Sequence, residues 1–153
     1  MKQISLFLLI AITSWFMACT SAPADGHEDK ITRTWYTQGK RSTIEVSANE
    51  DHYFGKITDL KRPLNLDGEP KRDYRNPDPD KKTNLLQGTK VLRNVSYKGD
   101  KVWEGVFYDH KTGKNYEVKI NLTEEGNLLL KSPDMEHDMT WRSEYPIGEE
   151  TVQ

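Results

Sequence analysis

The chain has 153 residues, a length that favours one domain at about 100–200 residues each. Its 22 Lys and Arg residues nearly balance 24 Asp and Glu, and the formal charge of -2 argues against a nucleic-acid-binding protein, which carries a basic stripe. The content of 10% aromatic residues is too high for a disordered chain, and a single Cys excludes an internal disulfide framework and a Cys-based zinc site.

The first 18 residues predict a lipoprotein signal peptide. Lys2 supplies a positive start, and the apolar run at 4–18 is shorter than the ~20 residues of a membrane span. The run ends in Ala18 and Cys19, which resembles a bacterial lipobox, where the lipidated Cys becomes the first mature residue. We therefore expect an exported protein anchored in the bacterial envelope through Cys19. The alternative is ordinary cleavage after residues 22–24, which would yield a soluble secreted or periplasmic protein.

Residues 19–30 are small or charged and predict a flexible tether, followed by a domain at 31–145 and a flexible tail at 146–153. Within the domain, apolar residues alternate with polar ones. The clearest case is the segment 116–122, in which one face is wholly apolar and the other wholly polar, as in an antiparallel strand buried on one side. We predict eight strands, at about 32–37, 42–48, 52–60, 89–97, 101–109, 114–122, 127–131 and 138–143.

Turn signals at 38–40, 49–51, 98–100, 109–113 and 124–126 separate successive apolar runs. Short links of this kind predict an all-β, antiparallel up-and-down meander. Eight such strands close into a barrel just wide enough for a packed core or one small ligand.

One connection, residues 61–82, interrupts the pattern of short turns. It contains four prolines and twelve charged residues. A loop of this length is usually functional or disordered. Two interpretations stay open, namely a lid over the barrel and a solvated surface excursion.

Several segments together resemble the bacterial family catalogued as domain of unknown function 2147. The matching patterns are YFGKI at 53–57, DxxNPD at 73–78, LLxG at 85–88, WxGxxYDxxxGKxY at 103–116 and WR at 141–142. The resemblance covers residues 32–143 and implies a small exported domain with a lipocalin-like (calycin) barrel. It implies no catalytic residue, because the family name records no common activity.

We expect Trp35 on the first strand to lie beside Arg142 on the last strand in a closed barrel. An Arg guanidinium stacked on the Trp ring would then seal one end of the barrel. This arrangement also resembles the Trp–Arg plug of lipocalins.

The candidate ligand-binding residues are aromatic side chains of the mouth and interior, with two polar residues of the long loop as selectors. They are Tyr53, Trp103, Phe107 and Tyr108, with Asp73 and Asn76. The facing of the strand at 101–109 stays open, because both of its faces carry apolar groups. Asp73, Asn76 and Asp78 are oxygen ligands of the type that binds Ca²⁺, but their spacing is not that of an EF-hand, and we expect them to cap the loop or line the barrel mouth.

Met135, His137 and Met139 would share one face of an extended chain, and two thioethers with an imidazole suit Cu(I). No second cluster supports this copper site, so we expect neither a metal nor a cofactor. The sequence also contains no nucleophile elbow, zinc-protease motif or phosphate loop.

The leading hypothesis is a non-enzymatic envelope lipoprotein whose barrel binds a small apolar ligand or an envelope component. The alternatives are a structural or interaction protein with a self-filled barrel, and an enzyme that uses the 61–82 loop as a lid. A large apolar cavity would favour the ligand-binding hypothesis, and convergent acid–base pairs at the loop would favour the enzyme. The ligand and the oligomeric state are not determined by the sequence.

Overall fold

The computed structural model of the chain describes residues 28–49 and 52–143, which form one antiparallel β-sheet with three short 3-10 helices. The strands are β1 (Thr34–Tyr36), β2 (Ser42–Asn49), β3 (His52–Leu60), β4 (Lys90–Gly99), β5 (Val102–Asp109), β6 (Lys114–Leu122), β7 (Leu128–Lys131) and β8 (Met139–Trp141). The helices are η1 (Glu28–Ile31), η2 (Gln38–Lys40) and η3 (Pro79–Lys81). Each strand pairs with the next one along the chain, so the predicted eight-stranded meander is confirmed for the part of the chain that the structure describes.

The alternation of apolar and polar residues explains the sheet. In β6, Val118, Ile120 and Leu122 are buried, whereas Glu117 and Lys119 between them are exposed. Register shifts interrupt the β2–β3, β3–β4 and β4–β5 pairs. Such bulges bend strands and increase their twist, which allows the sheet to curl into a barrel.

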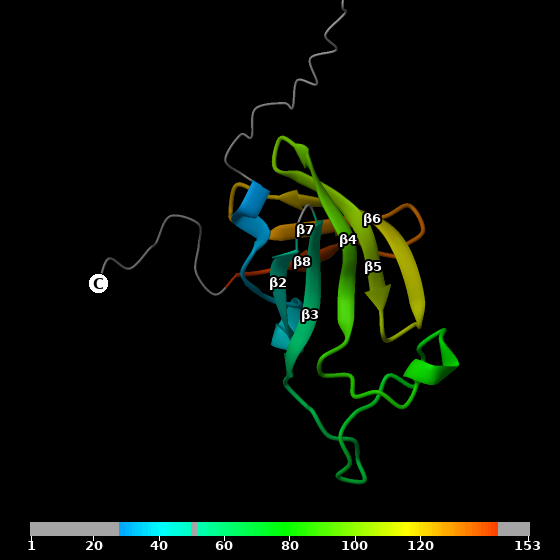
Figure 1. Cartoon of the computed structure of the whole chain (residues 1–153). Coiled ribbons are helices and arrows are strands. Elements are labelled where there is room, and N and C mark those ends of the chain that lie inside the picture. Colours follow the sequence, from blue (N-terminus) through cyan, green and yellow to red (C-terminus); the bar gives the residue numbers. More distant parts are fainter. Residues whose placement is uncertain (1–27, 50–51, 144–153) are drawn as a thin grey trace, which may run out of the picture.

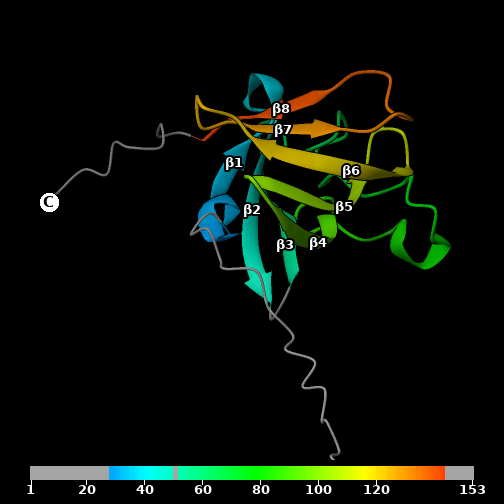
Figure 2. The same cartoon turned by 90° about the horizontal axis from the view of Figure 1, so that it is seen from above.

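The barrel closes between its first and last strands. The Tyr36 N–H donates to the Arg142 carbonyl at 2.7 Å, and the Arg142 N–H donates to the Tyr36 carbonyl at 2.9 Å. Figure 2 shows the sheet curling round so that β8 returns beside β1. These two hydrogen bonds form a single bridge, so the predicted lipocalin-like barrel is nearly closed.

The interior of the barrel is filled by large side chains. Trp35, Trp103 and Trp141 have at most 1% of their surface exposed and belong to one core cluster, to which all eight strands and η1 contribute apolar side chains. The Trp35 indole N–H donates to the carbonyl of Ile31 in η1 at 2.8 Å, so η1 is attached to one end of the barrel. Figure 1 places η1 at the end opposite the long loop between β3 and β4. We call these the closed end and the open end.

The predicted stacking of Arg142 on Trp35 is wrong, although the two strands are neighbours. The guanidinium beside the Trp35 ring belongs to Arg33, 5.8 Å from the ring centroid. Alternation along β8 is the physical reason: Trp141 occupies the inward position, so the next residue, Arg142, points outward and is exposed. Arg142 contributes to closure through its backbone instead.

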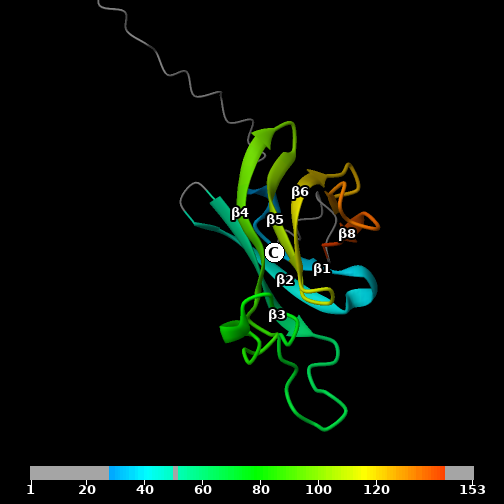
Figure 3. The ribbon, with the colours of Figure 1, turned by 90° about the vertical axis from the view of Figure 1, so that its right-hand side faces the viewer.

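The long loop has two parts, as Figure 3 shows at the open end. Residues 63–70 form a projecting hairpin, closed by the hydrogen bond from the Lys71 N–H to the Pro63 carbonyl. Residues 71–88 are held in place by backbone hydrogen bonds. The Leu86 N–H donates to the Lys71 carbonyl at 2.8 Å, and the Gly88 N–H donates to the Ile57 carbonyl of β3 at 2.7 Å. The second part is therefore a fixed component of the domain, and only the first part projects.

The predicted signal peptide, the lipidation site Cys19 and the tail at 146–153 lie outside the described residues. Of the predicted tether, only residues 28–30 are described, and they belong to η1. Among the described residues, no helix has the length and apolar character needed to cross a membrane.

Candidate functional site

A cavity of about 90 Å³ opens at the mouth of the barrel. Its floor is apolar and includes Ile44, Ile57, Phe107 and Trp141 from four different strands. Ligand cavities usually measure about 300–1,000 Å³. The barrel therefore offers a shallow apolar recess at its open end, and most of its interior is occupied by its own side chains.

The predicted ligand-binding aromatics separate into two groups. Phe107 lines the mouth cavity and contacts Trp141 edge-to-face, with ring centroids 5.9 Å apart. Tyr53 and Trp103 belong to the buried core, and Trp103 packs against Tyr97 at 5.0 Å. The facing of β5 is also settled: Trp103 and Phe107 point inward and Glu104 points outward, while Tyr108 is buried against the long loop.

Asp73 is the centre of a buried polar cluster that joins the long loop to the barrel. The Tyr108 hydroxyl donates to Asp73 Oδ1 at 2.6 Å, and the Asn76 amide donates to Asp73 Oδ2 at 2.7 Å. Burial and the neighbouring carboxylate raise the pKa of Tyr108, so its hydroxyl stays protonated and continues to donate. The structure thus brings together three predicted site residues, and their contacts position the loop.

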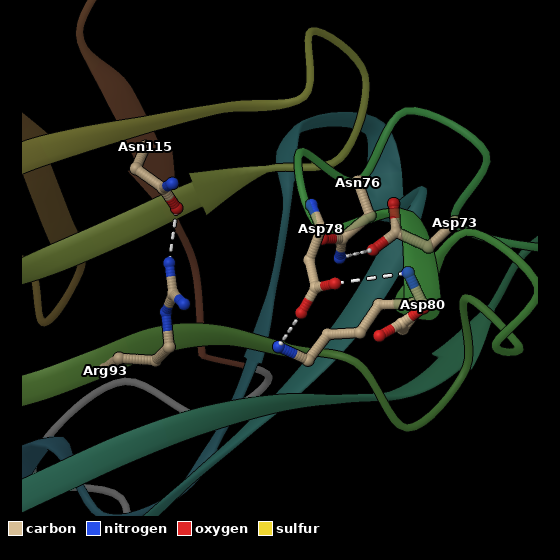
Figure 4. Close-up of polar contacts among 7 residues, drawn as sticks. Asp73, Asn76, Asp78, Asp80, Arg93 and Asn115 are labelled. Carbon is tan, nitrogen blue, oxygen red and sulfur yellow. Dashed lines mark hydrogen bonds and ion pairs between the residues drawn. The ribbon is translucent and has the colours of Figure 1, made fainter.

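A second cavity, of about 410 Å³, lies between this loop and the outer face of the barrel, and Figure 4 shows its polar contacts. Arg93 of β4 donates to Asn115 of β6 across it. The pKa of Asp78 is held below its usual value by the hydrogen bond from Lys81 and by the Asp80 N–H. Because its side chain accepts from the Asp80 N–H, Asp78 caps the N-terminus of η3, as expected for a loop-fixing residue.

The residues considered for metal binding do not converge. Residues 133–137 form turns and bends, so the extended geometry assumed for the copper site is wrong. Met135 and Met139 pack against the core, whereas His137 is exposed beside Glu136 at 3.7 Å. Within residues 28–49 and 52–143, no group of three or more His, Cys, Asp or Glu side chains is arranged to hold a metal ion.

His110, in the turn between β5 and β6, stands at the mouth. Its burial lowers its pKa, partly opposed by the adjacent Asp109, so the imidazole is neutral near pH 7. It lines the mouth cavity together with a larger one beside it.

Sequence reasoning missed a cluster of cationic side chains at the open end. Five cationic residues surround the larger cavity, and we call them the basic rim: Arg41, Lys61, Arg62, Lys71 and Lys111. They come from the β1–β2 turn, the long loop and the β5–β6 turn. The only signal in the sequence was the basic character of the loop ends, and a charged loop is ordinarily just a solvated surface.

A nearly closed, eight-stranded up-and-down barrel with its loops at an open end defines a lipocalin-like fold. The solved structure of protein HP1028 from the human pathogen Helicobacter pylori, described as belonging to the lipocalin family, is similar to it. The TM-score is 0.60 at 20% identity, over 73% of this chain and 81% of that one.

The chain belongs to the family described as "Uncharacterized protein conserved in bacteria (DUF2147)", whose model matches residues 33–144. The resemblance inferred from the sequence motifs is confirmed. A comparison with curated proteins yields no match.

Proposed function

We propose that this protein is an exported, non-enzymatic binding protein that takes up a small ligand at the open end of its barrel. The mouth cavity with its apolar floor carries this proposal, since Ile44, Phe107 and Trp141 leave a recess where the rest of the interior is filled. An apolar floor beneath a polar margin is the usual construction of a small-molecule site. The small volume limits the apolar part of the ligand to a few carbon atoms.

The self-filled barrel is the second candidate function. The three buried Trp residues favour it, because they occupy the space in which a wide barrel would hold a ligand. The two candidates differ in a single respect: a ligand-binding barrel must have a mouth that a small molecule enters.

Native mass spectrometry of the full, naturally processed chain tests the proposal. We expect a co-purified small molecule that is lost in Ser42→Trp, because Ser42 lies on the inward face of β2 beside Ile44 and lines the mouth cavity, which an indole would fill. The control is Lys119→Trp, on the exposed face of β6. A chain that carries no molecule, and whose tryptophan fluorescence does not respond to short alcohols or acids, would favour the self-filled barrel.

We also propose that Cys19 carries the membrane anchor. The described chain begins in η1 at the closed end (Figure 1), so an anchor on that side would leave the mouth exposed. Two or three acyl chains give stable membrane attachment, whereas one is marginal.

Cys19→Ser is therefore expected to move the protein from the membrane fraction to the soluble fraction. The measurement is immunoblotting of fractionated cells, with Ser21→Ala as a control that leaves the lipobox intact. An equal distribution of wild type and Cys19→Ser would support ordinary cleavage after residues 22–24.

A further inference from the structure

The basic rim gathers five cations around one cavity of about 720 Å³. Arg41 follows η2, Lys61 and Lys71 belong to the long loop, and Lys111 belongs to the β5–β6 turn. These segments are far apart in the sequence and meet at the open end (Figures 1 and 3). The chain as a whole carries a net charge of -2, so this concentration of positive charge arises from the fold and not from the composition.

Among the described residues, no cation of the basic rim forms an ion pair with a carboxylate. The ion pairs of Lys side chains in that part of the chain are Lys81–Asp78, Lys101–Glu124 and Lys131–Asp138. Asp109, which lines the adjoining mouth cavity, uses its carboxylate within its own turn and accepts from Lys111 N–H at 2.9 Å and Thr112 Oγ1 at 3.0 Å. Like charges around one cavity repel one another, and an anion placed there would relieve that repulsion.

The cavity surrounded by the basic rim, which we call the rim cavity, adjoins the mouth cavity of the barrel. Four residues line both cavities: Arg41, Ser42, His110 and Lys111. The rim cavity itself has buried Leu60 and Leu86 in its wall. A molecule with a charged head group in the rim cavity would therefore direct an attached apolar group towards Phe107 and Trp141 in the mouth cavity.

We propose that the ligand of the open end is a small anionic amphiphile, with a phosphate or carboxylate head group held by the basic rim and a short apolar tail in the mouth cavity. This inference rests on the function proposed above and specifies the chemistry of its ligand. The planar, two-pronged guanidinium of Arg41 suits the oxygen pair of either head group. The cavity of about 90 Å³ restricts the tail to a few carbons.

Isothermal titration of the full chain, held in phosphatidylcholine nanodiscs if it is lipidated, tests this inference. The titrants are hexyl phosphate, hexanoate, hexanol and inorganic phosphate. We expect hexyl phosphate to bind at least about tenfold more tightly than hexanol, a difference of ~1.4 kcal/mol, and more weakly as salt is added. The double variant Arg41→Gln/Lys61→Gln should lose that advantage and bind hexyl phosphate no more tightly than hexanol.

The matched control is Lys98→Gln/Lys119→Gln, which removes two exposed lysines away from the rim and should bind as wild type does. Equal affinities for hexanol and hexyl phosphate would overturn the anionic head group and leave the proposed function in place. Binding of none of the four titrants would overturn both. Inorganic phosphate that binds as tightly as hexyl phosphate would overturn the amphiphile.

The source of the head group is tested by sedimentation with phosphatidylglycerol vesicles. The soluble Cys19→Ser chain is compared with the same chain that also carries Arg41→Gln/Lys61→Gln. If the first sediments with these vesicles and the second does not, the head group is that of a lipid. A chain that stays in solution while it binds hexyl phosphate identifies a free small molecule. Sedimentation that is unchanged in the rim variant would overturn the rim as the anion site for lipid.

Discussion

Trp35→Ala is expected to lower the free energy of unfolding by about 3–5 kcal/mol, out of a typical total of ~5–15. The indole is fully buried, and its N–H donates to the Ile31 carbonyl at 2.8 Å. The substitution therefore leaves a cavity in the core and also removes the hydrogen bond that attaches η1. Urea unfolding followed by circular dichroism measures the effect.

Two further variants separate the contributions to this effect. Trp35→Phe keeps much of the ring volume and loses one donor, so it should cost about 0.5–1.5 kcal/mol, the net contribution of one hydrogen bond. The Ile31 carbonyl still accepts from the Arg33 N–H at 2.9 Å in this variant. Arg33→Ala should couple to Trp35→Ala, because the Arg33 guanidinium lies 5.8 Å from the ring centroid. Arg142→Ala should add independently to Trp35→Ala. Strong coupling between Trp35 and Arg142 would contradict the outward orientation of Arg142.

Gly113→Ala is expected to cost about 2–5 kcal/mol and to release the fixed part of the long loop. Gly113 has φ +76°, and a Cβ there would overlap the carbonyl oxygen of Arg75. The left-handed backbone alone costs roughly 1–2 kcal/mol, and the overlap forces the loop away from the β5–β6 turn at a cost of ~1–3 more. Urea unfolding measures the destabilisation, and trypsin cleavage at Lys71 and Arg75 measures the release.

The control is Gly99→Ala at the end of β4, where the glycine has φ +93° and an added Cβ would have no atom within 4 Å. It should show the backbone cost alone and leave the rate of trypsin cleavage in the loop unchanged. If both variants open the loop equally, the contact between Gly113 and Arg75 does not hold it.

These contacts change the interpretation of the 61–82 loop. Asp73, Tyr108 and Asn76 connect it to β5 through hydrogen bonds of 2.6 and 2.7 Å. A lid that opens and closes would have to break this buried cluster. The part of the loop that lies outside this cluster is the hairpin at 63–70, where Leu66 is fully exposed.

The sequence by itself determined the strands and their order. Alternation in segments such as 114–122, and turn residues between them, are local signals, and short links leave each strand no partner but its neighbours. The family and the lipocalin-like barrel followed from the same local patterns. For Asp73 and Asn76 the sequence left two roles open, as ligand selectors at the barrel mouth or as side chains that fix the loop by hydrogen bonds.

Only the tertiary structure decided what the side chains do. The burial of Trp103, the outward turn of Arg142 and the bond from Tyr108 to Asp73 depend on register and on the way the sheet closes. The register and the closure of the sheet are both set by pairings between residues that are distant in the sequence. The basic rim is the clearest case: Arg41, Lys71 and Lys111 are separate charged positions in the sequence, and only closure of the barrel brings their three segments to one end.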